Sequence, residues 1–221
     1  MNSKSEYIPF WVYIIESPSP DDLYLNINEG EIPLKTLPLL GIMTIRNITA
    51  NSNLFKKALT EDIYTISENF KKVPVLHIST HGDERGLSLT DESIISWEKL
   101  KEYLNPINQE YKDILIVCLS ACESWAGCKM AMYSGTRPFF YLIGCIGSPS
   151  WRETVVGFTS FYNLLTKEKK FSETINAMNS ASGGTYFAGT TAQDLQAIYL
   201  NELQKSLDRW LEMGKNIPKN Q

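Results

Sequence analysis

The apolar run at residues 114–119, Ile-Leu-Ile-Val-Cys-Leu, constrains the fold of this chain more than any other stretch. Polar and apolar residues do not alternate in this run. Such a continuous apolar run is typical of a strand buried on both faces of a parallel sheet. The run then breaks into Ser120, Ala121 and Cys122. In open α/β sheets, ligands and catalytic groups gather beyond the carboxyl ends of the strands. We therefore expect Cys122 to lie at that edge of the sheet, just past a central strand.

A second stretch repeats this design. Residues 73–80 have the pattern of a short apolar strand, which runs directly into His81 and Gly82. A histidine therefore ends one predicted strand, and a cysteine ends another. If the two strands are parallel neighbours, both side chains emerge at the same edge of the sheet.

The remaining patterns alternate between strands and helices. Apolar runs at residues 10–16, 41–48 and 139–147 predict strands, of which the second lies nearer the sheet edge. Helical spacing of apolar residues covers 54–70 and 154–165, among other segments. This alternation is typical of a largely parallel sheet covered by helices. The sequence thus predicts the α/β class.

The length of 221 residues fits one large domain with a terminal extension. We place the domain at residues 1–190. Residues 193–211 carry one more helical stripe of apolar side chains. Residues 191–221 are therefore expected to form a C-terminal helix and tail that pack on the same domain.

Charge and cysteine content narrow the function classes. The net charge is −4, without a basic tail or stripe, which argues against nucleic acid as the main partner. No apolar run approaches the roughly 20 residues that a membrane span needs, and the N-terminus lacks the regions of a signal peptide. The four cysteines are best explained as reduced thiols. We therefore expect a cytoplasmic protein with neither nucleic-acid nor membrane partners.

The order of these segments resembles the caspase-like cysteine peptidases, which include caspases, metacaspases, gingipains, separases and bacterial CHAT-domain proteins. The blocks that carry the resemblance are VLHISTHG, which ends in His-Gly, and ILIVCLSAC, which ends in Ala-Cys. The residues around Cys122 are nearest to the bacterial CHAT-like members. The resemblance covers roughly residues 9–185. It implies a three-layer fold with a mostly parallel central sheet of about six strands flanked by helices.

The resemblance also implies an activity, that of a thiol protease: a hydrolase that cuts peptide bonds with a cysteine–histidine dyad and uses no metal or other cofactor. Cys122 would be the nucleophile, and His81 would take its proton and later protonate the leaving amine. The backbone N–H groups of Gly82 and Cys122 would form the oxyanion hole. The substrate is then a protein or peptide. Regulation by a partner protein or a signal, as in prokaryotic defence systems, belongs to the same hypothesis.

Two features predict opposite substrate preferences. Residues Ser150, Trp151 and Arg152 are similar to the Ser-Trp-Arg of caspases, whose arginine helps to hold an acidic side chain before the scissile bond. By this resemblance Arg152 would bind a carboxylate, and Trp151 would line a neighbouring pocket. Asp22, in the loop after the first strand, would instead attract a basic side chain. The preference stays open at this point.

Three alternatives accompany this hypothesis. The chain could be a non-catalytic interaction module that keeps the caspase-like fold, or a small-molecule acyl transferase or hydrolase that uses the same dyad. A metal site could be built from Cys118, Cys122, Cys128 and His81, although their spacings match no usual zinc or iron–sulfur pattern. His77, four residues before His81, is expected to be a core residue or to support the site from behind.

Overall fold

The structure is a computed structural model that describes residues 9–132 and 135–215, the last six of these by their backbone alone. The start of the chain, for which the sequence predicts no signal peptide, lies outside the described residues. The tail expected after residue 215 lies outside them as well.

The strands of the main sheet are β1 (Phe10–Ser17), β2 (Thr44–Ile48), β3 (Val73–Asp83), β6 (Ile116–Ser120), β7 (Tyr141–Cys145) and β8 (Phe187–Thr191). Within the described residues they follow one another in the order β2-β1-β3-β6-β7-β8. All neighbours pair in parallel except β7 and β8, which are antiparallel. The predicted edge position of β2 and the mostly parallel sheet are confirmed.

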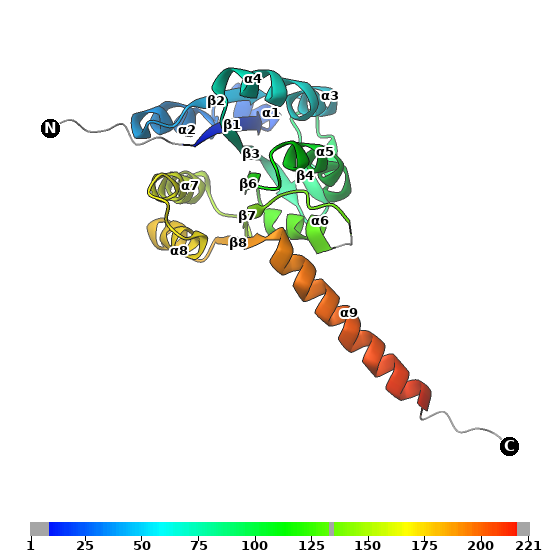
Figure 1. Cartoon of the computed structure of the whole chain (residues 1–221). Helices are drawn as coiled ribbons and strands as arrows, with labels where there is room; N and C mark the ends of the chain where they lie inside the picture. The colour runs from blue at the N-terminus through cyan, green and yellow to red at the C-terminus, as the bar shows by residue number, and fades with distance from the viewer. Residues whose placement is uncertain (1–8, 133–134, 216–221) are drawn as a thin grey trace.

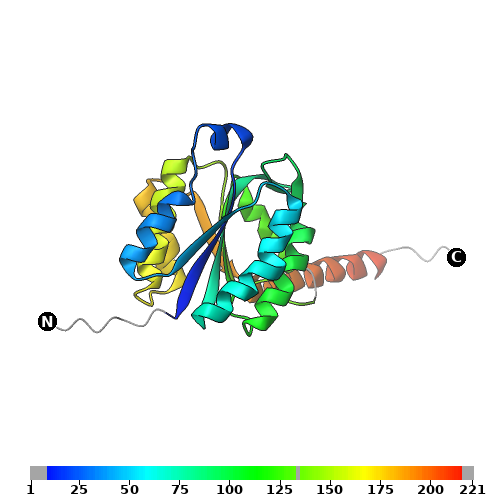
Figure 2. The same ribbon diagram turned by 90° about the horizontal axis from the view of Figure 1, so that it is seen from above.

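The helices, including short 3₁₀ and π segments, are α1 (Pro20–Tyr24), α2 (Glu31–Thr36), η1 (Leu37–Leu40), α3 (Ser52–Lys57), η2 (Ala58–Asp62), α4 (Ile63–Phe70), α5 (Trp97–Glu110), η3 (Ser124–Cys128), α6 (Lys129–Met132), α7 (Trp151–Leu165), α8 (Phe171–Ser182) and α9 (Ala192–Lys215). They lie on both sides of the sheet (Figures 1 and 2). One face packs against α3, α4 and α5 through a core that includes Trp11 and Leu100. The other packs against α2, α7 and α8 through a core that includes Phe158 and Met178. The predicted three-layer α/β class is therefore confirmed.

The register between β3 and β6 brings the two sequence blocks to one edge of the sheet. Ser79 of β3 lies opposite Ser120 of β6, so the two strands reach the edge together. His81 and Cys122 each follow two residues later, and the parallel adjacency that the sequence argument assumed is present. Past that edge β3 continues into a small antiparallel ribbon with β4 (Gly86–Ser88), which in turn pairs with β5 (Ile94–Ser96).

The last strand of the sheet, β8, has no counterpart in the sequence prediction. Its residues read Phe-Ala-Gly-Thr-Thr, with one large apolar side chain, so the segment carries little strand signal by itself. The segment is stabilised as a strand by its pairing with the apolar strand β7, not by the strand preference of its own residues.

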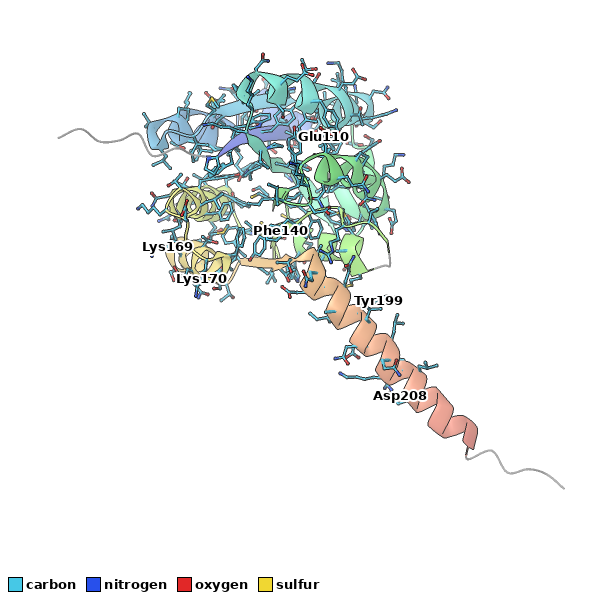
Figure 3. The ribbon with its side chains drawn as sticks, viewed as in Figure 1. Glu110, Phe140, Lys169, Lys170, Tyr199 and Asp208 are labelled. Atoms are coloured by element: carbon cyan, nitrogen blue, oxygen red, sulfur yellow. The ribbon has the colours of Figure 1, made fainter. Side chains whose placement is uncertain are left out.

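The long helix α9 begins directly after β8. Its first turns contact the body of the protein, mainly at β8 and α6, and bury Ala192 and Leu195 in the core. The rest projects away from the sheet, as the positions of Tyr199 and Asp208 show (Figures 1 and 3). Leu203 and Leu207 of its apolar stripe are about half exposed. Of the residues expected to pack on the domain, Ala192 and Leu195 lie in the core, while the end of the expected tail lies outside the described residues. None of the helices in the described ranges is both long and apolar enough to cross a membrane.

Candidate active site

Cys122 lies in the tight turn that follows β6, and this turn is fixed by a buried serine. The Ser124 hydroxyl donates a hydrogen bond to the Leu119 carbonyl oxygen at 2.9 Å and accepts one from the Cys145 N–H at 2.9 Å. It therefore ties the turn to the last residues of both β6 and β7. Cys122 itself remains partly exposed. A nucleophile on a braced turn at a sheet edge meets a substrate with little reorganisation.

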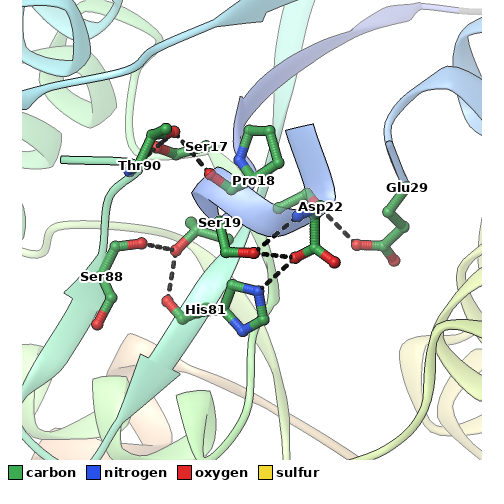
Figure 4. Close-up of polar contacts among 10 residues, drawn as sticks. Ser17, Pro18, Ser19, Asp22, Glu29, His81, Ser88 and Thr90 are labelled. Carbon is green, nitrogen blue, oxygen red and sulfur yellow. Dashed lines mark hydrogen bonds and ion pairs between the residues drawn. The ribbon is translucent and has the colours of Figure 1, made fainter. Parts of the chain in front are cut away.

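His81 is oriented by a carboxylate. Its Nε2 atom lies 2.8 Å from Oδ2 of Asp22, which belongs to α1 (Figure 4). The Ser19 hydroxyl donates to the same oxygen at 2.6 Å and also caps α1 by accepting from the Asp22 N–H. Partial burial would raise the pKa of Asp22, but the hydrogen bonds from Ser19 and His81 outweigh it, so the pKa of Asp22 is lowered. The Asp22 carboxylate is therefore ionised and places a negative charge beside the imidazole.

His81 and Cys122 line the same pocket, which has a volume of about 140 Å³. Trp151 forms another wall, with its ring edge-on to the His81 ring at a centroid distance of 6.3 Å. The pocket lies between the carboxyl edge of the sheet and the start of α7. Its remaining lining includes Glu29, Thr80, Ser120 and Thr154.

The start of α7, which carries Trp151, is set by a local capping motif. The Ser150 hydroxyl accepts from the backbone N–H of Glu153, and the Glu153 carboxylate accepts from the Ser150 N–H at 2.5 Å. This reciprocal pair satisfies two backbone donors that a helix start otherwise leaves free. The sequence Ser-Trp-Arg-Glu therefore holds Trp151 at the mouth of the pocket.

A buried glutamate, Glu29, forms part of the same pocket, and the sequence analysis did not single it out. Its residue is only 4% exposed. The Ser120 hydroxyl donates to its Oε1 atom at 2.6 Å, and the Ser79 hydroxyl donates to its Oε2 atom at 2.5 Å. Burial raises the pKa of Glu29, while hydrogen bonds from Ser120, Ser79 and Thr154 oppose this shift. Ser79 and Ser120 form the last register pair between β3 and β6, so the carboxylate lies across the point where the two strands stop pairing.

The two residues expected to form an oxyanion hole lie against one another. A Cβ atom added to Gly82 would lie 3.1 Å from the Cys122 carbonyl oxygen and 3.1 Å from the Ala121 Cβ. Any residue other than glycine would thus push against the turn that carries Cys122. Among the described residues, no acceptor pairs with the Cys122 N–H. Gly82 itself does not line the pocket.

Arg152 lies outside this pocket, in the neighbouring groove. That groove has a volume of about 400 Å³ and shares Trp151 and Glu29 with the first pocket. Ile27 and Val156 contribute to its apolar lining. Trp151 therefore lines both the pocket with Cys122 and the neighbouring groove, whereas Arg152 lines the groove alone.

The other three cysteines are buried, and none forms a disulfide. Burial raises the pKa of Cys118 and of Cys145 to about 12, and it also raises the pKa of Cys128. A thiol with such a pKa is almost entirely protonated at neutral pH and is a poor nucleophile. Cys122 is the cysteine that solvent and a substrate reach.

His77 is a core residue, as expected. Its Nδ1 atom lies 3.0 Å from the Tyr162 hydroxyl, and its ring packs edge-on against Phe158. Burial lowers the pKa of His77 to about 3, so the ring is neutral. In the described part of the chain, no three His, Cys, Asp or Glu side chains gather in a way that could hold a metal ion.

The structure thus brings together four of the residues singled out in the sequence: His81, Cys122, Trp151 and Asp22. It places Asp22 on His81, a different position from the substrate pocket in which the sequence argument put it. It adds Glu29, which looks in the sequence like a loop acid before a glycine. The one available signal was its place near the first strand's end, and that does not distinguish it from Asp21 or Glu31.

Comparison of the chain with models of known protein families and with curated proteins gives no match. The assignment of a function therefore rests on the geometry of the site.

Proposed function

We propose that this protein is a cysteine endopeptidase that cleaves peptide bonds with Cys122 as the nucleophile and His81 as the general base and acid. The observation that carries this proposal is the shared pocket of Cys122 and His81, with Asp22 hydrogen-bonded to Nε2 of the imidazole. The resemblance of the two sequence blocks to caspase-like peptidases agrees with it.

The first step is attack of the thiol on the peptide carbonyl. Because Nε2 of His81 is engaged by Asp22, the Nδ1 atom is the one left to take the proton from Cys122. The sulfur forms a bond to the carbonyl carbon, and the carbonyl oxygen becomes an oxyanion. The Cys122 N–H, which lacks an acceptor in the described part of the chain, supports stabilisation of that charge. Asp22 stabilises the imidazolium and acts as a positioning residue.

The second step is breakdown of the tetrahedral intermediate. The carbon–nitrogen bond breaks, and the leaving amine takes the proton from His81. Water then attacks the resulting thioester while His81 accepts a proton from it. The carbon–sulfur bond breaks, the acid product leaves, and the proton returns to the sulfur. No oxidant, reductant or cofactor is needed to balance these steps.

The test is covalent labelling by a peptidyl acyloxymethyl ketone, followed by intact-mass measurement. Wild type should gain one adduct, which Cys122→Ala abolishes and His81→Ala slows by roughly 100-fold. Cys128→Ala, which removes a buried thiol outside the pocket, is the matched control and should label like wild type. Equal labelling of wild type and His81→Ala would refute the dyad.

The second candidate function is a non-catalytic interaction module. The observation that favours it is the projecting helix α9, on which Ile198, Leu200, Leu203 and Leu207 are each about half exposed. Absence of any adduct, together with unchanged partner capture by Cys122→Ala, would favour this alternative. The third alternative, a small-molecule acyl transferase, uses the same dyad and would instead label with acyl thioesters but not with peptide probes.

The location, substrate and regulation of the protein follow from the same proposed function. We place it in the cytoplasm, because all four of its cysteines are free thiols. Its substrate would be a protein or peptide, cut at one or a few sites. A regulatory partner protein would control that cleavage, and the exposed apolar side chains of α9 are one surface for such a contact.

A further inference from the structure

We propose that the pocket beside Cys122 accepts a basic side chain, lysine or arginine, from the residue just before the scissile bond, and that Glu29 is its acidic partner. This inference rests on the proposed peptidase function and specifies its substrate class. The sequence left that class open, with Arg152 and Asp22 pointing in opposite directions.

The position of Glu29 is fixed by contacts of Glu29 and Gly30 with residues of three neighbouring strands, β1, β3 and β6. Its carboxylate takes hydrogen bonds from Ser79 of β3 and Ser120 of β6. The next residue, Gly30, donates its N–H at 2.8 Å to Glu16, which is the penultimate residue of β1. A Cβ atom on Gly30 would lie 2.7 Å from a Glu16 carboxylate oxygen, so only glycine allows this approach. The loop is thus pinned with Glu29 pointing into the site.

The charge on Glu29 lacks a cationic partner in the structure. Both of its oxygens accept hydrogen bonds from hydroxyl groups, and no lysine or arginine lines the pocket in the described part of the chain. Arg46 lies near Glu16 instead, at 3.3 Å. A buried carboxylate without a counter-charge is costly, and a guanidinium or ammonium group compensates it. Burial raises the pKa of Glu29, and a bound cation would oppose that shift by stabilising the carboxylate.

The remaining walls suit the rest of a basic side chain. Trp151 contributes an aromatic side chain to the wall, and the faces of aromatic rings attract cations and pack against methylene groups. Ala121 and Pro149 add apolar surface. The volume of about 140 Å³ is sufficient for one side chain. Because the pocket opens beside Cys122, a side chain that fills it belongs to the residue whose carbonyl carbon the sulfur attacks.

An acidic substrate side chain in this pocket would be repelled. It would place a second carboxylate next to Glu29, and two like charges in one buried pocket repel strongly. Arg152, the candidate partner for an acidic residue, lies in the neighbouring groove beyond Trp151. Arg152 is therefore available to residues further along a substrate, not to the residue in this pocket.

The first experiment tests the pocket without assuming peptidase activity. Iodoacetamide alkylation of Cys122 is followed by intact mass in the presence of benzamidine, a flat arginine-like cation, or of benzamide, its neutral counterpart. We expect benzamidine to slow alkylation at least about tenfold more than benzamide does in wild type. In Glu29→Gln the difference should disappear. Glu31→Gln, an equal charge change at an exposed site ion-paired with Lys35, should behave like wild type.

The second experiment compares peptidyl acyloxymethyl ketones that end in arginine, in its neutral isostere citrulline, or in aspartate. The second-order labelling rate of wild type should be at least about tenfold higher for arginine than for citrulline, and lowest for aspartate. In Glu29→Gln the ratio of arginine to citrulline should fall to about one. Because the wild-type comparison needs no variant, it stands even if Glu29→Gln folds poorly.

The outcomes separate this inference from the proposed function. Equal rates for arginine and citrulline, or a preference for aspartate, would overturn the basic pocket while leaving the peptidase intact. Protection by benzamidine without labelling by any peptide probe would support the cation pocket and overturn the peptidase. If neither protection nor peptide labelling occurs, both fail.

Discussion

The Nε2 atom of His81 lies 2.8 Å from Oδ2 of Asp22, although 59 residues separate them in the chain. The sheet brings them together. The last residue of β1, Ser17, pairs with Thr80 of β3, so the helix that follows β1 starts beside the histidine. Ser19 then caps that helix and donates to the same Asp22 oxygen, which fixes the carboxylate toward the ring.

The first prediction concerns this pair. Asp22→Asn removes the anion but keeps a side chain of the same shape, so the imidazolium loses its stabilising charge. We expect the labelling rate of Cys122 by a peptidyl ketone to fall roughly 100-fold, with little change in thermal stability. Asp21→Asn is the matched control, since Asp21 lies on the same helix and does not contact His81. If both variants label alike, Asp22 does not position the histidine.

The second prediction concerns the reactivity of the four cysteines. Iodoacetamide at pH 7.5 should modify Cys122 first and leave the buried Cys118 and Cys145 unmodified, because burial holds the pKa of each near 12. Peptide mapping after a short exposure gives the site. Addition of urea to unfold the chain should then expose all four thiols. Modification of Cys118 or Cys145 before Cys122 in the folded protein would contradict the burial described above.

The third prediction links His77 to the pH dependence of stability. The pKa of His77 is about 3 in the folded protein and near 6.5 in an unfolded chain. Between these values the unfolded state binds one more proton, so the free energy of unfolding falls as pH decreases below 6.5. From pH 7 to pH 5 the loss due to His77 is about 2 kcal/mol, and it is absent at higher pH.

Urea unfolding of wild type and His77→Gln at both pH values measures this loss. The variant should be less stable at pH 7 and should show a smaller decrease toward pH 5. Tyr162 and Cys118, which face His77, have raised pKa values and do not titrate in this window. The raised pKa of Glu29 acts with the opposite sign in both proteins and cancels in the comparison. Parallel pH curves for the two proteins would exclude a buried neutral His77.

The fourth prediction concerns the turn that carries the nucleophile. Ser124→Ala leaves the Leu119 carbonyl and the Cys145 N–H without their buried partner. We expect a loss of about 1–3 kcal/mol in the free energy of unfolding and a slower reaction of Cys122 with the peptidyl ketone. Ser172→Ala, on the exposed side of α8, serves as control for both measurements. An unchanged labelling rate in a destabilised Ser124→Ala would show that the turn keeps its shape without this bond.

The strands were predictable from the chain to the extent that they are buried on both faces. The mainly apolar stretches 10–15, 73–80 and 114–119 lie in or beside β1, β3 and β6, the buried strands at the centre of the sheet. The strand at Phe187–Thr191 was missed, because its stability comes from pairing with β7 and not from its own residues. The helix after it was predicted, but its projection from the body was not, since an apolar stripe gives no information about what covers it.

The sequence by itself determined the α/β class and the two positions, His81 and Cys122, that face the same pocket. Continuous apolar runs specify buried strands, and a polar residue at the end of such a run is forced to the edge of the sheet. Only the tertiary structure decided which charges gather there. Asp22 meets His81, and Glu29 meets Ser79 and Ser120, across separations of 50 to 91 residues. Contacts of that range depend on strand order and register, and local sequence does not encode them.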